Sequence, residues 1–470
     1  MNSKKILAFA LGPVASAALG LIAVPAMAWA FSPEDVGRLN ILQVSLSFCL
    51  LFSVLGLDQA YVREFHESSD RLKLLKACFI PGFLILLITG ILAIAFDSEL
   101  SRLLYATANP TFYWITFFCA ITLFISRFLS LILRMEERGL AFSMSQIIPK
   151  ALQLLLLFFA IIFSVQRDFF AILGITFLSS FAVLVVCAWN TRKQWIPAIY
   201  TQPNALEIKS LLKFGFPLIF SGIAYWGLNA TSTFVLRTNS SLSELGIYSV
   251  TSSFAGVAVI FQSIFTVIWA PTVYKWVAEG ADMARVDNVA KKALVLVCAI
   301  FIAVGSFSWF ADHLLPPHYR QVKYFLVCAI APSLLYTLSE VTCVGIGIMR
   351  RTSLTIWITL SALLANSTIC LMLVPKYGAA GAVIANTLGY LVFFIARTEA
   401  SAYVWRNFPR AKIYVFISLL VAFSVMTVVI GPMAPINHSL AWTLLTPIFI
   451  WFFRCELLEF IKSVQKNKVS

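Results

Sequence analysis

Fourteen long apolar segments occupy most of this 470-residue chain and constrain its fold more than any other feature. Each is close to the length of about 20 residues with which a helix crosses a bilayer. They cover residues 8–30, 40–57, 77–96, 112–133, 141–165, 169–189, 214–236, 246–274, 293–310, 324–348, 354–374, 379–396, 414–430 and 440–453. Because lipid offers no partner for an open strand edge, each spanning segment should be a helix. The sequence therefore predicts an all-α polytopic membrane protein with about 14 transmembrane helices.

The composition excludes a soluble globular protein. Hydrophobic residues make up 60% of the chain, charged residues only 12%, and the mean hydropathy is +0.89; a charged soluble surface does not reach these values. The nine cysteines show no paired spacing, so we interpret them as packing residues. Phosphate-binding GxxxxGK[ST], zinc-binding HExxH and nucleophilic GxSxG motifs are absent from the sequence. We therefore expect no cofactor and no ATP hydrolysis by this chain.

Lysine and arginine residues gather in alternate loops. With 14 spans, 26 of the 35 basic residues lie on one side, and the other side receives only Arg38, Arg102, Arg167, Arg237, Arg320, Lys323 and Lys376. By the positive-inside rule the first side is cytoplasmic, which places both termini there. This distribution explains the net charge of +14 without a nucleic-acid partner.

Two parts of the chain resemble each other at a nearly constant spacing. Gly12-Pro13 opens the first apolar segment as Gly215-Phe216-Pro217 opens the seventh, and residues 35–41 (DVGRLNI) parallel 244–250 (ELGIYSV). The pattern predicts duplicated six-helix halves. We expect an N-terminal lobe at 1–190, a cytoplasmic linker at 191–206, a C-terminal lobe at 207–398, and two further helices with a tail at 399–470. Since segment 6–31 is long enough to span and belongs to the repeat, we expect it to be retained rather than cleaved as a signal peptide.

Lys150 is the most unexpected polar residue, because it lies deep within an apolar segment. Ser143, Gln146 and Gln153 share its helical face. A lysine at the centre of a span costs about 3 kcal/mol on insertion scales, so it should face a wet cavity or an acidic partner. We interpret Lys150, with Gln146 and Gln153, as lining a cavity for an anionic substrate; a packing role beside a carboxylate is the alternative.

Other spans also carry polar side chains at helical spacing. Tyr225 and Asn229 share a face with Ser232, and together with the Lys150 face they predict a central polar cavity. Arg127 is a second candidate cavity cation, although it lies within snorkelling reach of the interface. Glu340 is a candidate ion or proton site, with pairing to an interior base as the alternative.

Several stretches carry a resemblance to a known family. They are residues 31–67 (FSPEDVGRLNILQVSLSFCLLFSVLGLDQAYVREFHE), LLKFGFPLIFSGIAYWGL, SELGIYSV and VPKYGAAGAVIANTLGY. In this order they resemble the Wzx-type O-antigen and polysaccharide flippases of the multidrug/oligosaccharidyl-lipid/polysaccharide (MOP) exporter superfamily. LGLDQAYVREF is the most specific stretch, and we regard its Asp58, Arg63 and Glu64 as candidate gating residues. Ser232 stands where many relatives have an acid, which argues against coupling schemes that need that acid.

The resemblance implies a flippase of a bacterial inner membrane and not an enzyme. It would carry the head group of a polyprenyl-pyrophosphate-linked oligosaccharide to the periplasmic leaflet by alternating access, while the lipid tail stays among the membrane lipids. A polysaccharide polymerase is an implied partner. Two alternatives stay open: a cation-coupled multidrug exporter of the same superfamily, and a polysaccharide polymerase or membrane glycosyltransferase.

Overall fold

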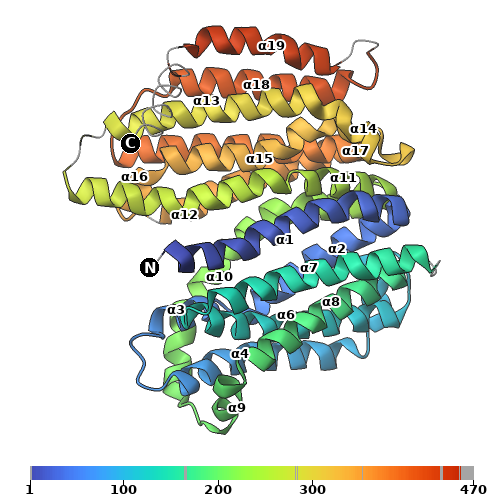
Figure 1. Ribbon diagram of the computed structural model, residues 1–470, viewed down its shortest axis with the longest axis vertical. Coiled ribbons are helices and arrows are strands. Elements are labelled where there is room, and N and C mark those ends of the chain that lie inside the picture. The colour runs from blue at the N-terminus through green and yellow to red at the C-terminus, as the bar shows by residue number, and fades with distance from the viewer. Residues whose placement is uncertain are drawn as a thin grey trace. The chain divides into compact units, whose positions relative to one another are not determined.

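The computed structural model describes residues 3–163, 167–280, 282, 284–351, 353–434, 438–454 and 456. Within these residues the chain is built from helices and contains no strand. It divides into two compact units, Met1–Thr233 and Phe234–Ser470 (Figure 1). The boundary falls inside one long helix, α10 (Ala205–Asn239). The predicted lobes remain a prediction, and the segment predicted as a linker contains a helix of its own, α9 (Arg192–Tyr200).

The first unit contains nine helices before α10 in the described residues. They are α1 (Ser3–Ala30), α2 (Pro33–Val54), α3 (Leu57–Glu64), α4 (Arg71–Ala93), α5 (Asp97–Tyr105), α6 (Pro110–Met135), α7 (Gly139–Ile162), α8 (Phe169–Asn190) and α9. The second unit contains α11 (Leu242–Phe254), α12 (Gly256–Ala278), α13 (Ala284–Phe307), α14 (Ala311–Leu314), α15 (Val322–Thr342), α16 (Val344–Ile348), α17 (Ser353–Val404), α18 (Ala411–Ile430) and α19 (His438–Phe452), with 3-10 turns at Ser308–Phe310 and Pro317–Tyr319.

The predicted spanning segments coincide with helices. In the described part of the chain, eleven helical stretches are long and apolar enough to cross a membrane. One of them, α17, holds two predicted segments, while α11 with α12 and the shorter α19 account for the last two. The protein is thus a multi-pass all-α membrane protein, as predicted.

Several predicted boundaries were wrong. The span predicted at 40–57 begins at Pro33, because Ser32 caps the helix and proline occupies its first position. The segments at 246–274 and 324–348 are each interrupted, at Ala255 and Cys343. The segment at 379–396 continues to Val404 and therefore includes Arg397, which was expected in a loop.

Equivalent helix starts support the internal repeat. Ser32 caps α2 by accepting a hydrogen bond from the backbone N–H of Asp35, and Ser241 caps α11 by accepting one from the N–H of Glu244. Each cap places an acid in the first turn, where the helix dipole favours a negative charge. The resemblance between residues 35–41 and 244–250 therefore has a structural counterpart.

A close contact joins α1 to α7 within the first unit. The backbone N–H of Gly12 donates to the Ser143 Oγ at 3.0 Å, and a Cβ on Gly12 would lie 2.7 Å from the Ser143 Cα. The two helices run side by side in Figure 1. Ser143 is consequently buried against α1, so this end of the predicted polar face serves helix packing.

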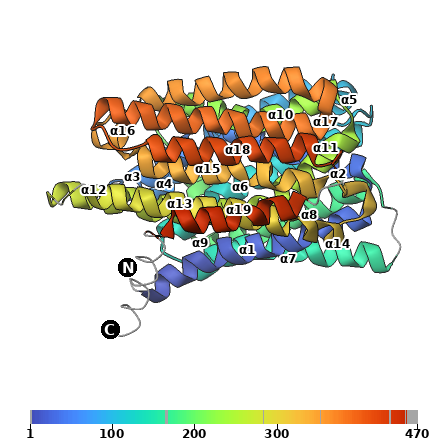
Figure 2. The same ribbon diagram turned by 90° about the horizontal axis from the view of Figure 1, so that it is seen from above.

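Helix α15 forms the centre of the second unit. It packs against α11, α12, α13, α17 and α18, and almost all of its residues are buried. Figure 2 shows α15 between α17 and α13, and it contacts both helices. Two hydrogen bonds cross this interface: the Thr342 and Thr398 hydroxyls share one at 2.7 Å, and the Thr387 hydroxyl donates to the Cys328 carbonyl at 2.8 Å.

Helix α17 is divided by a kink. Gly378 has a φ of 52°, a left-handed conformation that glycine adopts without strain. The freed N–H of Ala379 donates to the Glu244 carboxylate at 2.7 Å, which replaces the interrupted helical bond. The acid of the second repeat therefore stabilises the break between two predicted spans.

Candidate functional site

A cavity of about 960 Å³ lies within the first unit. It is bounded by α2, α3, α6 and the first half of α10. Its polar lining residues are Ser47, Asp58, Gln59, Arg63, Arg127, Ser221 and Tyr225. We call this the polar cavity; its volume is in the range of protein sites that bind small-molecule ligands.

Two glycines bring the walls of the polar cavity together. Leu55 and Gly56 have φ values of 54° and 69°, and this left-handed pair ends α2 and starts α3. Gly215 of α10 packs directly on the turn, so a Cβ on Gly215 would lie 2.5 Å from the Leu55 carbonyl oxygen. A Cβ on Gly56 would overlap the Gly215 backbone. Residues 55–59 (LGLDQ) are therefore in contact with residues 215–217 of the repeat, and each stretch needs its glycine for this contact.

Asp58 and Arg127 form an ion pair across the cavity wall. The Arg127 Nη2 lies 2.6 Å from the Asp58 Oδ2, and the Asp58 Oδ1 accepts a hydrogen bond from the Gln59 N–H at 2.8 Å. The Asp58 side chain is 12% exposed and that of Arg127 is 40% exposed. Because a guanidinium has five N–H donors, an exposed Arg127 in this pair can still donate to a ligand. Arg127 therefore has an acidic partner just after the end of the second span.

Arg63 provides a second guanidinium in the polar cavity. Its planar group lies over the Phe214 ring at 4.7 Å, a contact that orients it without neutralising its charge. Its ion pair with Glu64 is long, at 3.6 Å, and the Arg63 side chain is 57% exposed. Of the charged side chains in the cavity wall, two are cationic and one, Asp58, is anionic. The cavity is therefore suited to an anionic ligand.

Neutral groups complete the lining. The Ser47 Oγ accepts a hydrogen bond from the Trp226 Nε1 at 3.0 Å and donates to the Val44 carbonyl at 2.7 Å. The Ser221 hydroxyl donates to the Leu218 carbonyl within its own helix. With Gln59 and Tyr225, these side chains supply hydroxyl and amide groups of the kind that bind sugar hydroxyls.

The structure places four of the ten predicted site residues in the polar cavity: Asp58, Arg63, Arg127 and Tyr225. Glu64 does not line the cavity, but it forms the long, 3.6 Å ion pair with Arg63. Asn229 is exposed one turn beyond Tyr225, and its side chain donates to the Tyr225 carbonyl at 2.8 Å. Their proposed roles in binding and gating remain predictions.

Lys150 lies elsewhere in the first unit, on α7. Its Nζ donates to the Gln153 Oε1 at 3.3 Å, which joins two members of the predicted polar face. Lys150, Gln146 and Gln153 are all half-buried, and none of them lines the polar cavity. Their predicted contact with substrate therefore has no counterpart in that cavity.

Glu340 lies in the second unit and has a basic partner. Its Oε1 is 2.8 Å from the Arg397 Nη1, with the two side chains only 10% and 12% exposed. Arg397 also donates to the Ser339 hydroxyl at 2.8 Å and lies over the rings of Tyr336 and Phe393. This is the pairing with an interior base that the sequence left as an alternative to an ion site.

Sequence reasoning missed several of these features. The Asp58–Arg127 pair was not foreseen, although an acid just after the second span and a base within the fourth were both visible. Gln59, Ser221 and Phe214 were not singled out because none is unusual in an apolar sequence. Within the described residues no cluster of three or more His, Cys, Asp or Glu side chains could hold a metal ion.

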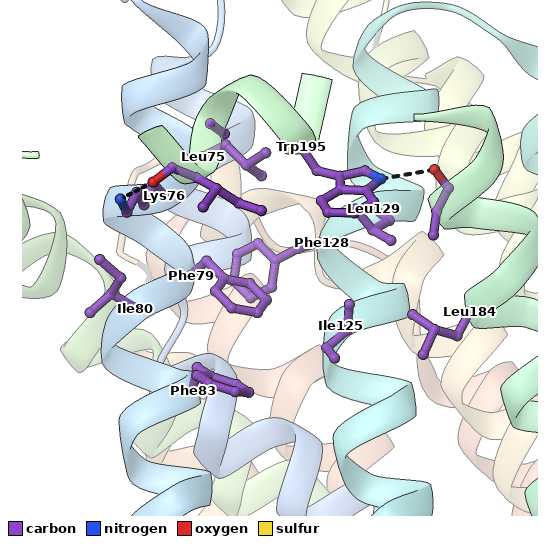
Figure 3. Close-up of a pocket in the computed structure, with 13 residues that line it drawn as sticks. Leu75, Lys76, Phe79, Ile80, Phe83, Ile125, Phe128, Leu129, Leu184 and Trp195 are labelled. Carbon is purple, nitrogen blue, oxygen red and sulfur yellow. Dashed lines mark hydrogen bonds between the residues drawn. The ribbon is translucent and has the colours of Figure 1, made fainter. Parts of the chain in front are cut away.

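A second, apolar cavity of about 510 Å³ is bounded by α4, α6, α8 and α9 and is open on one side. Figure 3 shows its side chains facing one another from α4 and α6, with Trp195 of α9 covering one end. Ile125, Phe128 and Leu129 of α6 belong to this cavity, whereas Arg127 belongs to the polar one. Helix α6 therefore separates an apolar from a polar compartment.

Comparison with known proteins identifies a family. The model of a family described as "Polysaccharide biosynthesis protein" matches residues 3–277, which is more than half of the chain. None of the curated protein sequences gives a significant match.

Solved structures share the fold at low sequence identity. Lipid II flippase MurJ, in an inward closed conformation, has a TM-score of 0.68 at 14% identity, over 97% of this chain and 99% of its own. A multidrug resistance MATE family transporter of the MOP superfamily, in an inward-facing conformation, has a TM-score of 0.58 at 14% identity, over 83% and 95%. A MOP superfamily transporter from Pyrococcus furiosus has a TM-score of 0.51 at 16% identity, over 85% and 96%. The predicted MOP-type fold is confirmed.

Proposed function

The chain belongs to the polysaccharide biosynthesis protein family, and from this premise we propose that it is a flippase for polyprenyl-pyrophosphate-linked oligosaccharides. It moves their head groups from the cytoplasmic to the periplasmic leaflet of a bacterial inner membrane, with both of its own termini in the cytoplasm. O-antigen or another surface polysaccharide unit is the cargo. A polysaccharide polymerase is the partner that receives it. The proposed reaction is transport without covalent chemistry, so the protein is not an enzyme.

The observation that carries this proposal is the pair of guanidinium groups, Arg63 and Arg127, in one polar cavity. Arginine binds phosphate oxygens through two parallel hydrogen bonds, which suits a pyrophosphate better than a neutral ligand. Asp58 holds Arg127 in place at 2.6 Å until an anion shares its donors. The hydroxyl and amide groups beside them then bind the sugars.

In the same proposal, the arginines lower the cost of moving a charged head group through a region of low dielectric. A pyrophosphate without partners would lose its hydration there, and charge-assisted hydrogen bonds offset that loss. The lipid tail remains in the bilayer throughout. Lys150 with Gln146 and Gln153 is proposed as a further contact for the head group; these side chains are half-buried and lie outside the polar cavity.

A second candidate is cation-coupled multidrug export, which the fold shared with a MATE family transporter favours. A cationic drug would need an acid in the cavity. Asp58 is the acid present there, but Arg127 neutralises it at 2.6 Å. This arrangement favours the anionic substrate.

The deciding experiment follows head-group access in proteoliposomes. Purified protein is reconstituted with a polyprenyl-pyrophosphate oligosaccharide, and an impermeant glycosidase added outside reports the substrate that reaches the outer leaflet. We expect protein-dependent access that falls in Arg127→Gln and Arg63→Gln, and persists in Arg102→Gln, a control on the exposed surface of α5. Unchanged access in both cavity variants, together with transport of a cationic dye along an ion gradient, would overturn the flippase proposal.

A further inference from the structure

The apolar cavity has no role in the proposed transport of a head group. Its walls include Phe79 and Phe83 of α4, Phe128 and Leu129 of α6, Leu184 of α8 and Trp195 of α9. The indole N–H of Trp195 donates to the Ala188 carbonyl at 2.9 Å and is therefore already satisfied (Figure 3). A cavity with such walls offers water few partners, so an apolar ligand fits it better. We call it the apolar slot.

Polar contacts hold the end of α8 and the start of α9 beside the apolar slot. The Gln194 amide donates to the Glu136 carboxylate at 2.7 Å, and the Arg138 guanidinium donates to the Asn190 carbonyl at 2.6 Å. Helix α9 exposes Ile196 and Tyr200, and Ile199 is exposed where it lines the slot. A short helix with exposed apolar and basic side chains is typical of one that lies in the membrane interface. We infer that α9 and the slot lie at the level where lipid head groups meet their chains.

A cation without an acidic partner in the described contacts marks the edge of the slot. Lys76 lines it, and its Nζ donates to the carbonyl oxygens of Ile199 and Thr201 at 2.5 and 2.6 Å. Both acceptors are neutral, and an ammonium group has three N–H donors. Arg192 and Lys193 are exposed on α9, and Arg192 donates to the neutral carbonyl of Trp189. Basic side chains therefore lie at the first turn of the helix that covers the slot, and Lys76 contacts the C-terminal end of the same helix.

We propose that the apolar slot binds one acyl chain of an anionic glycerophospholipid, whose phosphate lies at Lys76. The lipid comes from the leaflet on the basic side of the chain, which the proposed orientation makes the cytoplasmic leaflet. The volume of about 510 Å³ falls within the range of ligand-binding cavities. Apolar walls take the chain, and basic side chains near the surface attract the anionic head group.

The phospholipid is favoured over the lipid tail of the transported substrate by the position of the slot. Arg127 faces the polar cavity, whereas Phe128 and Leu129 face the slot, so helix α6 lies between the two. A substrate held by Arg127 would have to pass its tail around α6 to reach the slot. The bound phospholipid is thus a resident lipid rather than the cargo.

The test measures lipid binding to the full-length protein by native mass spectrometry, with no transport step. The probes are phosphatidylglycerol and phosphatidylcholine with identical acyl chains. We expect phosphatidylglycerol to bind several-fold more, and Lys76→Gln to reduce that preference about fivefold, since each basic residue near a head group contributes on that scale. Lys275→Gln, an exposed lysine on α12, is the charge control.

Filling the slot tests the chain site separately. Leu184→Trp should abolish the tight binding of both lipids, whereas Val185→Trp, at the neighbouring exposed position on α8, should not. If Leu184→Trp unfolds, Ala188→Leu supplies a smaller filling change in the same wall. Equal binding of both lipids, or full binding in the filled variants, overturns the proposal. A polyprenyl phosphate could also displace phosphatidylglycerol from the wild type and fail to bind to Leu184→Trp. That result would assign the slot to the substrate and would overturn the phospholipid proposal. Failure of flipping in proteoliposomes leaves these binding results unaffected.

Discussion

Arg127 forms an ion pair with Asp58, and in the proposed function it also binds an anion in the polar cavity. The 2.6 Å ion pair joins a largely buried carboxylate to a guanidinium that is 40% exposed. Desolvation limits what such a pair adds to stability, but loss of one partner leaves the other charge unmatched. The pair is therefore better suited to orienting Arg127 for a ligand than to stabilising the fold.

Arg127→Gln should lower head-group translocation about tenfold or more, because a hydrogen bond to a charged group is worth about 1.5–3 kcal/mol. Arg127→Lys should retain part of the activity, since it keeps the charge but loses the planar two-point contact. The initial rate of substrate exposure in proteoliposomes gives the measurement. Equal rates for glutamine, lysine and wild type would remove Arg127 from the substrate site.

The Glu340–Arg397 ion pair, in contrast, is better suited to maintaining the fold than to binding a ligand, because both side chains are almost fully buried. Glu340→Gln should destabilise the protein by about 3 kcal/mol, since it leaves the Arg397 charge without its acid. The double variant Glu340→Leu/Arg397→Met should recover most of that loss. The midpoints of thermal unfolding in detergent compare the single and the double variant with the wild type.

The same variants test the predicted ion site. If Glu340→Gln keeps its thermal stability but loses the dependence of transport on a proton or sodium gradient, then Glu340 binds the coupling ion and the structural role is wrong.

At the scale of the helix, interruptions of helices position polar side chains more than the continuous spans do. The left-handed turn at Leu55 and Gly56 starts α3 and so places Asp58 opposite Arg127. The kink at Gly378 exposes a backbone N–H that Glu244 binds. In both cases glycine allows a conformation that other residues adopt at a cost of about 1–2 kcal/mol.

Gly56→Ala and Gly215→Ala should each destabilise the first unit, because the added methyl group meets backbone atoms that cannot move aside like a side chain. Gly56→Ala should be the more severe change, as it also strains a φ of 69°. Gly20→Ala in α1 is the matched control: nothing lies within 4 Å of its added Cβ, and alanine should stabilise a helix interior by about 0.5–1 kcal/mol. Yield and thermal unfolding of the three variants provide the comparison. Wild-type stability in Gly56→Ala would contradict the proposed contact.

At the scale of the whole molecule, orientation follows from the distribution of charge over alternate loops. The 26 basic residues assigned to one side and the seven assigned to the other imply an even number of spans. Membrane insertion responds to charges near the ends of spans, so we predict that the loops on the more basic side stay in the cytoplasm.

A fusion at the C-terminus tests this orientation. We expect a green fluorescent protein fused after Ser470 to be fluorescent and an alkaline phosphatase fused at the same position to be inactive, because the latter requires export. Fusions after Asn109, in a loop predicted to face the periplasm, should give the reverse result. Phosphatase activity at the C-terminus would contradict the even number of spans.

The sequence alone determined the class of fold, because lipid imposes a simple rule on the chain. Backbone groups within a bilayer must be satisfied inside one segment, so runs such as 112–133 and 169–189 had to be helices of spanning length. The caps at Ser32 and Ser241 are likewise local, and the repeat was visible from the residues that follow them. The MOP-type resemblance rested on this same order of segments.

Only the tertiary structure decided which polar side chains meet. Asp58 and Arg127 are 69 residues apart in the sequence and lie on different helices. Lys150 and its partner Gln153, in contrast, are three residues apart on the same helix. Periodicity relates residues on one helix, and therefore it grouped Lys150 with Gln146 and Gln153 but could not pair α3 with α6. Glu340 met Arg397 only because α17 continues past the predicted end of its span and packs against α15. Contacts between helices depend on how their surfaces fit together, and that information is distributed over the whole chain.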